Sequence, residues 1–269
     1  MTFTLRETRL RENVWVWTPG GDRIETSYGA NCTAVVGRDS ALVVDPLIAP
    51  SFARLVAGAL SEKTSLPVEH VVVTHHHTDH SLGASWFARR GATVVAHPAC
   101  RDAMAAEHPA LVAARRQVPE LAELFRDADP YLPELVVEDS VTLDLGGSRA
   151  RVFHPGHGHT AGDLVVELEP ESVVVCGDLV SASYHVNYEE AAVENLERGL
   201  GMLSALGART YVPGHGPAGD SGILEDQLAY HAAAARAADV EALRKRFPHH
   251  ALPEVLPRSL AVWRKSRTR

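Results

Sequence analysis

Histidine clustering constrains this chain more than any other feature of its sequence. The chain has 15 histidines in 269 residues. Eight of them fall in three places that each follow a predicted strand: His75, His76, His77 and His80, then His154, His157 and His159, and finally His215. Sites in layered α/β proteins are built at the carboxyl ends of strands, and histidine is the commonest metal ligand. The pattern therefore predicts that distant strand ends converge on a metal site.

Composition and charge exclude several other classes of protein. Hydrophobic residues make up 45% and charged residues 22%, as in ordinary globular proteins. No apolar run is long enough for a membrane span, and the net charge of −8 argues against nucleic acid as a partner. Three scattered cysteines form no disulfide or metal pattern, and the first residues do not resemble a secretion signal. We therefore expect a cytoplasmic protein with neither membrane nor nucleic-acid partners.

Hydrophobic periodicity predicts an α/β chain with two groups of strands. An alanine-rich segment at about 98–130 separates the groups, and Pro109 and Pro119 within it predict short inserted helices. The chain has no low-complexity linker, so we expect a single domain over 1–269. The expected strands are 14–17, 33–36, 41–44, 71–73, 92–96, 135–137, 141–145, 151–153, 163–168, 172–176 and 210–212, and the expected helices are 51–61, 82–90, 190–206 and 223–246.

The segment His75-His76-His77-Thr78-Asp79-His80 has the spacing of a two-metal site. In an extended chain, residues i and i+2 face the same way, so His75 and His77 could bind one ion together. A turn at Thr78 would bring Asp79 and His80 toward a second ion about 3.5–4 Å away. This donor set suits zinc, with iron or manganese as alternatives. A surface cluster or an affinity tag is the competing interpretation, and the internal position and the interrupting Asp79 argue against it.

Four motifs in order resemble those of the metallo-β-lactamase superfamily. THHHTDH resembles its HxHxDH signature, and GHTAGD at 158–163, CGDL at 176–179 and PGHG at 213–216 resemble its later motifs. The resemblance implies a four-layer αββα sandwich. In such a sandwich, 98–130 would be a helical insertion and about 221–269 a C-terminal helical extension.

The resemblance also assigns roles to individual residues. It implies two zinc ions per chain, with His159 as the third ligand of the first ion; His157, two residues earlier, is the alternative. Asp79 would also act in catalysis, by orienting the nucleophile and accepting its proton. Substrate contact is expected from Tyr184 or His185, just beyond the bridging aspartate. The implied ligands are His75, His77 and His159 for one ion, Asp79, His80 and His215 for the other, and Asp178 between them.

The implied activity is hydrolysis of a carbonyl compound by metal-activated water. Many β-lactamases of the family have cysteine where Asp178 stands and lysine where Ser181 stands, so a small ester, thioester or lactone is favoured here. The alternatives are a β-lactamase and a mononuclear iron enzyme of the persulfide dioxygenase type. The insertion carries four arginines that could bind the anionic tail of a coenzyme A or carrier-protein thioester. The competing interpretation is that they form a solvated helix face. They are Arg101, Arg115, Arg116 and Arg126. The oligomeric state is not predicted.

Overall fold

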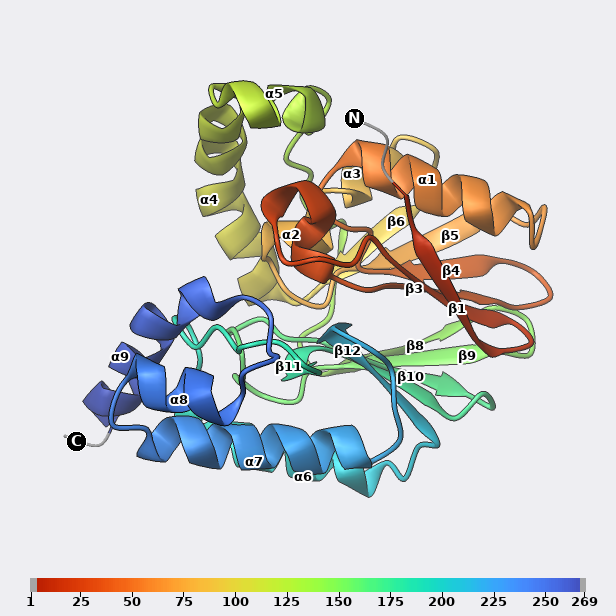
Figure 1. Ribbon diagram of the computed structural model, residues 1–269. Helices are drawn as coiled ribbons and strands as arrows, with labels where there is room; N and C mark the ends of the chain where they lie inside the picture. Colours follow the sequence, from red (N-terminus) through yellow and green to blue (C-terminus); the bar gives the residue numbers. More distant parts are fainter. Residues whose placement is uncertain (1–3, 267–269) are drawn as a thin grey trace.

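A computed structural model describes residues 4–266 and contains two β-sheets packed face to face (Figure 1). The first sheet has seven strands in sequence order, antiparallel from β1 to β4 and parallel from β4 to β7. Its strands are Arg6–Arg11 (β1), Val14–Thr18 (β2), Cys32–Val36 (β3), Ala41–Val44 (β4), Val68–Val72 (β5), Thr93–Ala96 (β6) and Leu135–Val136 (β7).

The second sheet has five strands in the order β12-β11-β10-β9-β8. Its pairs are antiparallel except for β11 and β12, which are parallel. Consequently the carboxyl ends of β11 and β12 lie at the same edge. The strands are Ser140–Asp144 (β8), Arg149–Phe153 (β9), Val165–Glu169 (β10), Val173–Ser181 (β11) and Thr210–His215 (β12).

Helices cover the outer face of each sheet, which confirms the predicted αββα sandwich. Helices α1 (Pro50–Ser61) and α3 (Ala84–Ala88) pack against the first sheet. Helices α6 (Leu196–Ala205) and α7 (Gly222–Arg236) pack against the second (Figure 1). None of the helices in the described part of the chain combines the length and the apolar character that crossing a bilayer requires.

The period-2 alternation of strand β2 shows why two sheets are needed. Val14 and Val16 point into the core between the sheets, whereas Trp15 and Trp17 point toward the helical layer, and all four side chains are buried. Successive residues of a strand face opposite sides, so a strand that is apolar on both faces needs cover on both. Each fully buried side chain of this kind contributes about 1.5–3 kcal/mol.

The inserted segment forms helices α4 (Pro98–Arg116) and α5 (Pro119–Phe125). The prediction that Pro109 breaks the first helix was wrong, because Pro109 lies inside α4. A buried stripe at four-residue spacing holds this helix together on both sides of the proline, and its packing outweighs the lost hydrogen bond. The stripe consists of Cys100, Met104, His108 and Val112.

Three other expectations about elements need correction. The helix expected over 190–206 begins only at Leu196, after a 3₁₀ turn at Val193–Asn195 (η2). The helix expected over 223–246 is two helices, α7 and α8 (Val240–Arg246), because Asp239 caps α8 by accepting a hydrogen bond from the amide of Ala242. Strand β1 was missed, because its charged sequence RETRLR is that of an exposed sheet edge.

The C-terminal segment adds α9 (Leu256–Ser266), which packs on α7 through the buried side chains of Leu256 and Leu260. The last three residues of the expected extension, 267–269, and the first three of the expected domain lie outside the described residues.

Candidate metal centre

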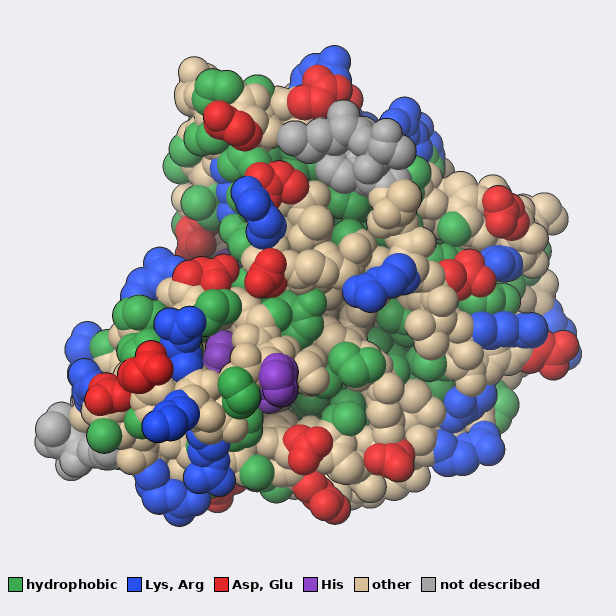
Figure 2. Space-filling view, in the orientation of Figure 1, with side chains coloured by type: hydrophobic (Ala, Val, Ile, Leu, Met, Phe, Trp, Pro, Cys, Tyr) green, Lys and Arg blue, Asp and Glu red, His purple; other side chains and the backbone are tan. Residues whose placement is uncertain are grey.

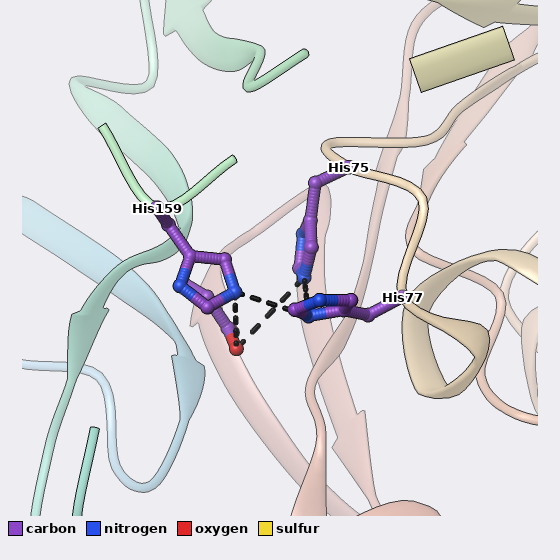
Figure 3. A group of neighbouring side chains, drawn as sticks. His75, His77 and His159 are labelled. Atoms are coloured by element: carbon purple, nitrogen blue, oxygen red, sulfur yellow. Dashed lines mark hydrogen bonds and ion pairs between the residues drawn. The ribbon is translucent and has the colours of Figure 1, made fainter. Parts of the chain in front are cut away.

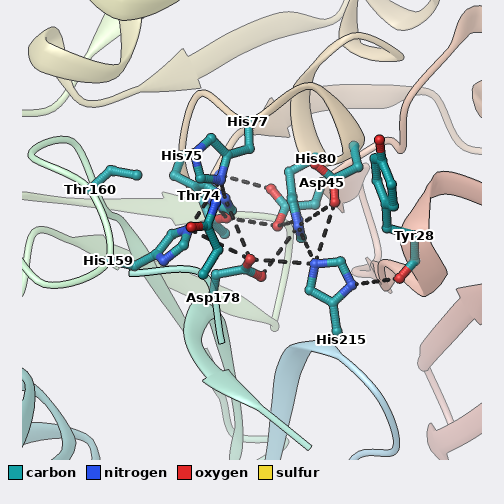
Figure 4. Close-up of polar contacts among 12 residues, drawn as sticks. Tyr28, Asp45, Thr74, His75, His77, His80, His159, Thr160, Asp178 and His215 are labelled. Carbon is teal, nitrogen blue, oxygen red and sulfur yellow. Dashed lines mark hydrogen bonds and ion pairs between the residues drawn. The ribbon is translucent and has the colours of Figure 1, made fainter. Parts of the chain in front are cut away.

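The structure brings all seven predicted ligands together at one end of the sandwich (Figure 4). Strand β5 runs into the histidine segment, which turns at once into the short helix α2 (Thr78–Ser81). The loop after β9 supplies His159, and β11 and β12 supply Asp178 and His215. Both sheets therefore contribute ligands. The fold brings these residues together, and their role as metal ligands stays a prediction.

The first group contains His75, His77, His159 and Asp178 (Figure 3). Nδ1 of His77 lies 3.1 Å from Nε2 of His75 and 3.0 Å from Nε2 of His159. Oδ2 of Asp178 lies 3.9 Å from the same nitrogen of His75 and 3.6 Å from that of His159. Metal–ligand bonds of 2.0–2.1 Å in a tetrahedron place neighbouring ligand atoms about 3.3 Å apart, so these separations suit a zinc-sized ion.

The second group contains Asp79, His80 and His215, with Asp178 beside it (Figure 4). Nε2 of His80 and Nε2 of His215 are 3.3 Å apart, and Oδ2 of Asp79 lies 3.5 and 3.4 Å from them. Asp178 reaches both nitrogens, with Oδ1 3.3 Å from His80 and Oδ2 3.4 Å from His215. Asp178 thus touches both groups, as a bridging ligand must.

The donor chemistry of both groups fits metal ions. Ring nitrogens that face one another at 3.0–3.3 Å need a shared proton or a cation between them, because two lone pairs repel. Oδ1 of Asp178 is buried without a hydrogen-bond partner in the described part of the chain. A buried carboxylate oxygen that accepts no hydrogen bond is costly, and a cation would stabilise it.

Three ligand histidines are held through their second ring nitrogen by groups of the same chain (Figure 4). Nδ1 of His80 donates to Asp45 Oδ2 at 2.9 Å, and Nδ1 of His215 donates to the Tyr28 carbonyl at 3.0 Å. Nδ1 of His75 lies 3.0 Å from the Thr74 hydroxyl, which itself donates to Asp45. These contacts leave Nε2 of each ring free to bind a metal.

Asp45 is the functional residue that sequence reasoning missed most clearly. It follows directly after the strand predicted over 41–44 and belongs to none of the motifs, yet it is buried and binds both Thr74 and His80. A signal was available, because an acidic residue at the end of a strand parallel to the histidine strand β5 has to lie beside those histidines.

Glu190 was also missed, and it lies outside the motifs. Its carboxylate accepts a hydrogen bond from Nε2 of His77 at 3.2 Å and lies 3.4 Å from Nε2 of His76. Its carbonyl accepts a hydrogen bond from Nε2 of His157 at 2.8 Å. His157 is therefore turned away from the cluster, and His159 is the histidine of this loop that reaches the first group.

Two glycines let the backbone approach the cluster closely. A Cβ atom at Gly214 would lie 1.8 Å from Oδ1 of Asp178, so any side chain there would displace the carboxylate. Gly177, directly before Asp178, has a positive φ of 54°, which other residues adopt only with strain.

The pKa values of the histidines differ between the two groups. In the first, burial lowers the pKa of His159 to about 3 and holds the pKa of His75 well below its usual range. In the second, burial is outweighed by Asp178 and Asp79, which raise the pKa of His215 to about 9. The pKa of Asp79 falls to about 2, because His80 and His215 outweigh its burial. His75 and His159 of the first group therefore stay neutral, whereas Glu190 and the nearby aspartates outweigh the burial of His77 and raise its pKa. The second group couples imidazolium to carboxylate.

A cavity of about 290 Å³ opens onto the cluster. The inserted helix α4 lines one side with Leu111 and Arg115, and Leu252 and Arg258 of the C-terminal segment line the other. The volume suits a small substrate.

The two residues expected to contact substrate differ in position. His185 lines the cavity, where its Nδ1 accepts a hydrogen bond from the Tyr230 hydroxyl. Tyr184 is not among the lining residues; its hydroxyl donates to the Gly21 carbonyl at 2.6 Å, and its ring lies 5.4 Å from that of His215.

Of the four arginines considered in the insertion, only Arg115 lines this cavity. Arg101 donates to the Pro133 carbonyl, Arg116 donates to Phe125 and Ala128, and Arg126 pairs with Glu123. These three arginines therefore belong to the helix surface outside the cavity.

Comparison with known proteins places the chain in a family. Residues 26–215 match the sequence profile of the Metallo-beta-lactamase superfamily, and the chain belongs to that superfamily. Members of this superfamily are metal-dependent hydrolases, and the fold and the two groups of histidines and aspartates agree with that class.

Individual relatives differ in activity. A Metallo-beta-lactamase type 2 from Bacillus cereus is 27% identical, over 83% of this chain and 81% of its own. An atrochrysone carboxyl ACP thioesterase from Aspergillus fumigatus is 26% identical, over 71% of this chain and 38% of its own. The solved structure of a metallo-beta-lactamase from Pontibacter korlensis superposes with a TM-score of 0.72 at 23% identity, covering 85% of this chain and 99% of that one, which supports the fold.

Proposed function

We propose that the protein is a hydrolase that binds two zinc ions and activates water for attack on the carbonyl carbon of a small ester, thioester or lactone, so that the acyl C–O or C–S bond breaks. The observation that carries the proposal is the pair of donor groups that share Asp178 beneath a small cavity. Three further donors beside Asp178 support a second ion, and so favour this function over a mononuclear iron enzyme.

The roles of the chain's own residues follow from their positions. When bound, the ions supply Lewis acidity and lower the pKa of water toward about 7. Asp79 is held ionised beside His80 and His215, so it can orient a water molecule by accepting a hydrogen bond from it. Asp45, Thr74 and the Tyr28 carbonyl keep the ligand rings in fixed orientations.

The proposed substrate is a small molecule, including the possibility of a coenzyme A or carrier-protein thioester. The relation to an ACP thioesterase supports the thioester class. Net charge is −8, and the face in Figure 2 carries acidic and basic side chains interspersed rather than one basic patch. Neither feature is that of a nucleic-acid surface.

A β-lactamase is the second candidate, because the Bacillus cereus relative aligns over most of both chains. Asp178 and Ser181 replace the cysteine and lysine that many such enzymes carry, which supports the first candidate. Hydrolysis of a chromogenic cephalosporin faster than that of thioesters and lactones would reverse this order.

Metal analysis combined with a hydrolysis screen tests the proposal. We expect two zinc ions per chain and turnover of thioesters, esters or lactones. His77→Ala and Asp178→Ala should lose metal and activity together while staying folded, and His249→Ala, at an exposed histidine outside the cluster, should keep both. Full turnover in either cluster variant would contradict the proposal.

A further inference from the structure

Arg115 is a partly buried cation that forms no direct ion pair, although the more distant charge of Asp79 partly offsets its burial. In the described part of the chain, no carboxylate lies within 4.0 Å of its guanidinium. Its neighbours in the insertion differ, since Arg116 pairs with Asp129 and Arg126 pairs with Glu123. Keeping a charge away from water without a partner costs free energy, so an unpaired arginine inside a cavity is an unusual feature.

The guanidinium of Arg115 is held in place from two sides. Its Nη1 donates to the Thr78 hydroxyl at 2.8 Å, and its Cζ lies 5.0 Å from the ring centroid of the fully buried Phe125. A planar group fixed in this way loses little rotamer entropy when a ligand binds, and its remaining N–H groups match the oxygens of a carboxylate.

Arg115 lies close to the predicted metal ligands. Its partner Thr78 directly precedes Asp79, so an anion bound to Arg115 would lie close to the cluster rather than at the outer surface. Glu107 and Glu254 line the same cavity, but both lie beyond ion-pair distance from Arg115. Arg258, the other arginine of the lining, is paired with Glu189 at 3.3 Å.

We propose that Arg115 binds a carboxylate of the substrate, so that the preferred substrates are small esters, thioesters or lactones that carry a carboxylate near the scissile carbonyl. This inference rests on the proposed function for the reaction and adds the substrate class. The short path from Thr78 to Asp79 favours a carboxylate of a small molecule over the phosphates of coenzyme A, which lie at the far end of its pantetheine arm.

Matched thioesters test the proposal. One pair is S-acetyl-3-mercaptopropionate and S-acetyl-3-mercaptopropanamide, and the other is the S-methyl thioester of glutaric acid and that of glutaramic acid. Within each pair only the carboxylate differs, and the two pairs place it on the leaving group or on the acyl group.

For at least one pair, the wild type should prefer the carboxylate member. Arg115→Gln should lower kcat/KM for that member about tenfold to a hundredfold, mainly through KM, and affect the amide member far less, so that the preference within the pair is lost. Arg126→Gln removes the same charge from the insertion outside the cavity and should change neither. Zinc content and Tm should stay the same in both variants.

A binding measurement is independent of turnover. Calorimetry with the zinc-loaded protein should show that glutarate binds at least about tenfold more tightly than glutaramate, and that Arg115→Gln abolishes the difference. This preference without hydrolysis of any thioester, ester or lactone would sustain the inference and remove the proposed function.

Two results would overturn the inference while the proposed function stands. One is equal turnover and equal binding of the charged and amide probes, unchanged in Arg115→Gln. The other is an effect of Arg115→Gln on acetyl-coenzyme A alone, which would assign the arginine to a phosphate.

Discussion

At the scale of single residues, the geometry of the candidate centre depends on groups outside the predicted ligand set. Asp45 is the clearest case, because one buried carboxylate binds the amide and hydroxyl of Thr74 and the ring of His80. It thereby fixes one ligand of the second group directly and His75 of the first group through Thr74. Partners of this kind commonly change metal affinity by about 10–100-fold.

Asp45→Asn should weaken zinc binding at the second group by about tenfold or more, because the amide is a poorer acceptor for the His80 ring. Competition with a chromogenic chelator measures the affinity of each site. Asp127→Asn, at an exposed aspartate, serves as the control. Unchanged affinity at both sites in a folded Asp45→Asn protein would refute this role.

The loop after β9 gives a second prediction at this scale. His159→Ala should remove the first-group metal, because its Nε2 is one of the clustered donor atoms. His157→Ala should keep that metal, since His157 binds the Glu190 carbonyl instead. Zinc content after dialysis distinguishes the two, and the reverse result would exchange their roles.

At the scale of elements, two helical segments that the family motifs do not include complete the site. Helix α4 contributes Arg115 and Leu111 to the cavity lining, and the C-terminal segment contributes Leu252 before α9 and Arg258 at its start. The C-terminal helices are fixed partly by polar contacts, since the Tyr188 hydroxyl donates to Nδ1 of the buried His231 on α7 at 2.5 Å.

The pH dependence of stability should report on this buried pair. Burial lowers the pKa of His231 to about 4, whereas an unfolded histidine titrates near 6.5. Between these values the unfolded chain binds a proton that the folded chain does not, so the free energy of unfolding should fall as pH drops from 6.5 to 4. The loss should reach roughly 3 kcal/mol at pH 4.

His231→Gln keeps an acceptor for Tyr188 but does not titrate, so its stability should fall less over the same interval. Denaturant unfolding at several pH values between 4 and 7 measures the slope. Identical slopes in the variant and the wild type would show that His231 does not carry this dependence.

At the scale of the whole molecule, the candidate metal centre draws its residues from both sheets. His75, His77 and His80 follow β5 of the first sheet, whereas Asp178 and His215 belong to β11 and β12 of the second. Metal ions bound there would link the two sheets, in addition to the apolar packing between them. Ligands that bind only the folded state raise its stability by mass action.

Removing metal should therefore lower the thermal stability of the entire chain. At a free zinc concentration of about 100 Kd, each site adds about 2.7 kcal/mol, or roughly 5–10 °C in Tm for a chain of this size. Calorimetry with and without a chelator measures the shift. Asp178→Asn should show a much smaller one, and equal Tm values for the zinc-loaded and stripped wild type would contradict the cross-link.

Sequence alone determined the strand pattern and the clustered donors. Alternating or continuous runs of valine predict strands, because successive side chains of a strand face opposite sides of the sheet. The ligand motifs are also recognisable from short stretches of sequence. The tertiary structure alone decided which distant groups support those ligands. Asp45, Glu190 and Arg115 belong to none of the four motifs, and each contacts a neighbour that only the packing of strands and helices brings within reach. Pro109 stays within α4 for the same reason, since the packing of the helix against the core outweighs the preference of one residue.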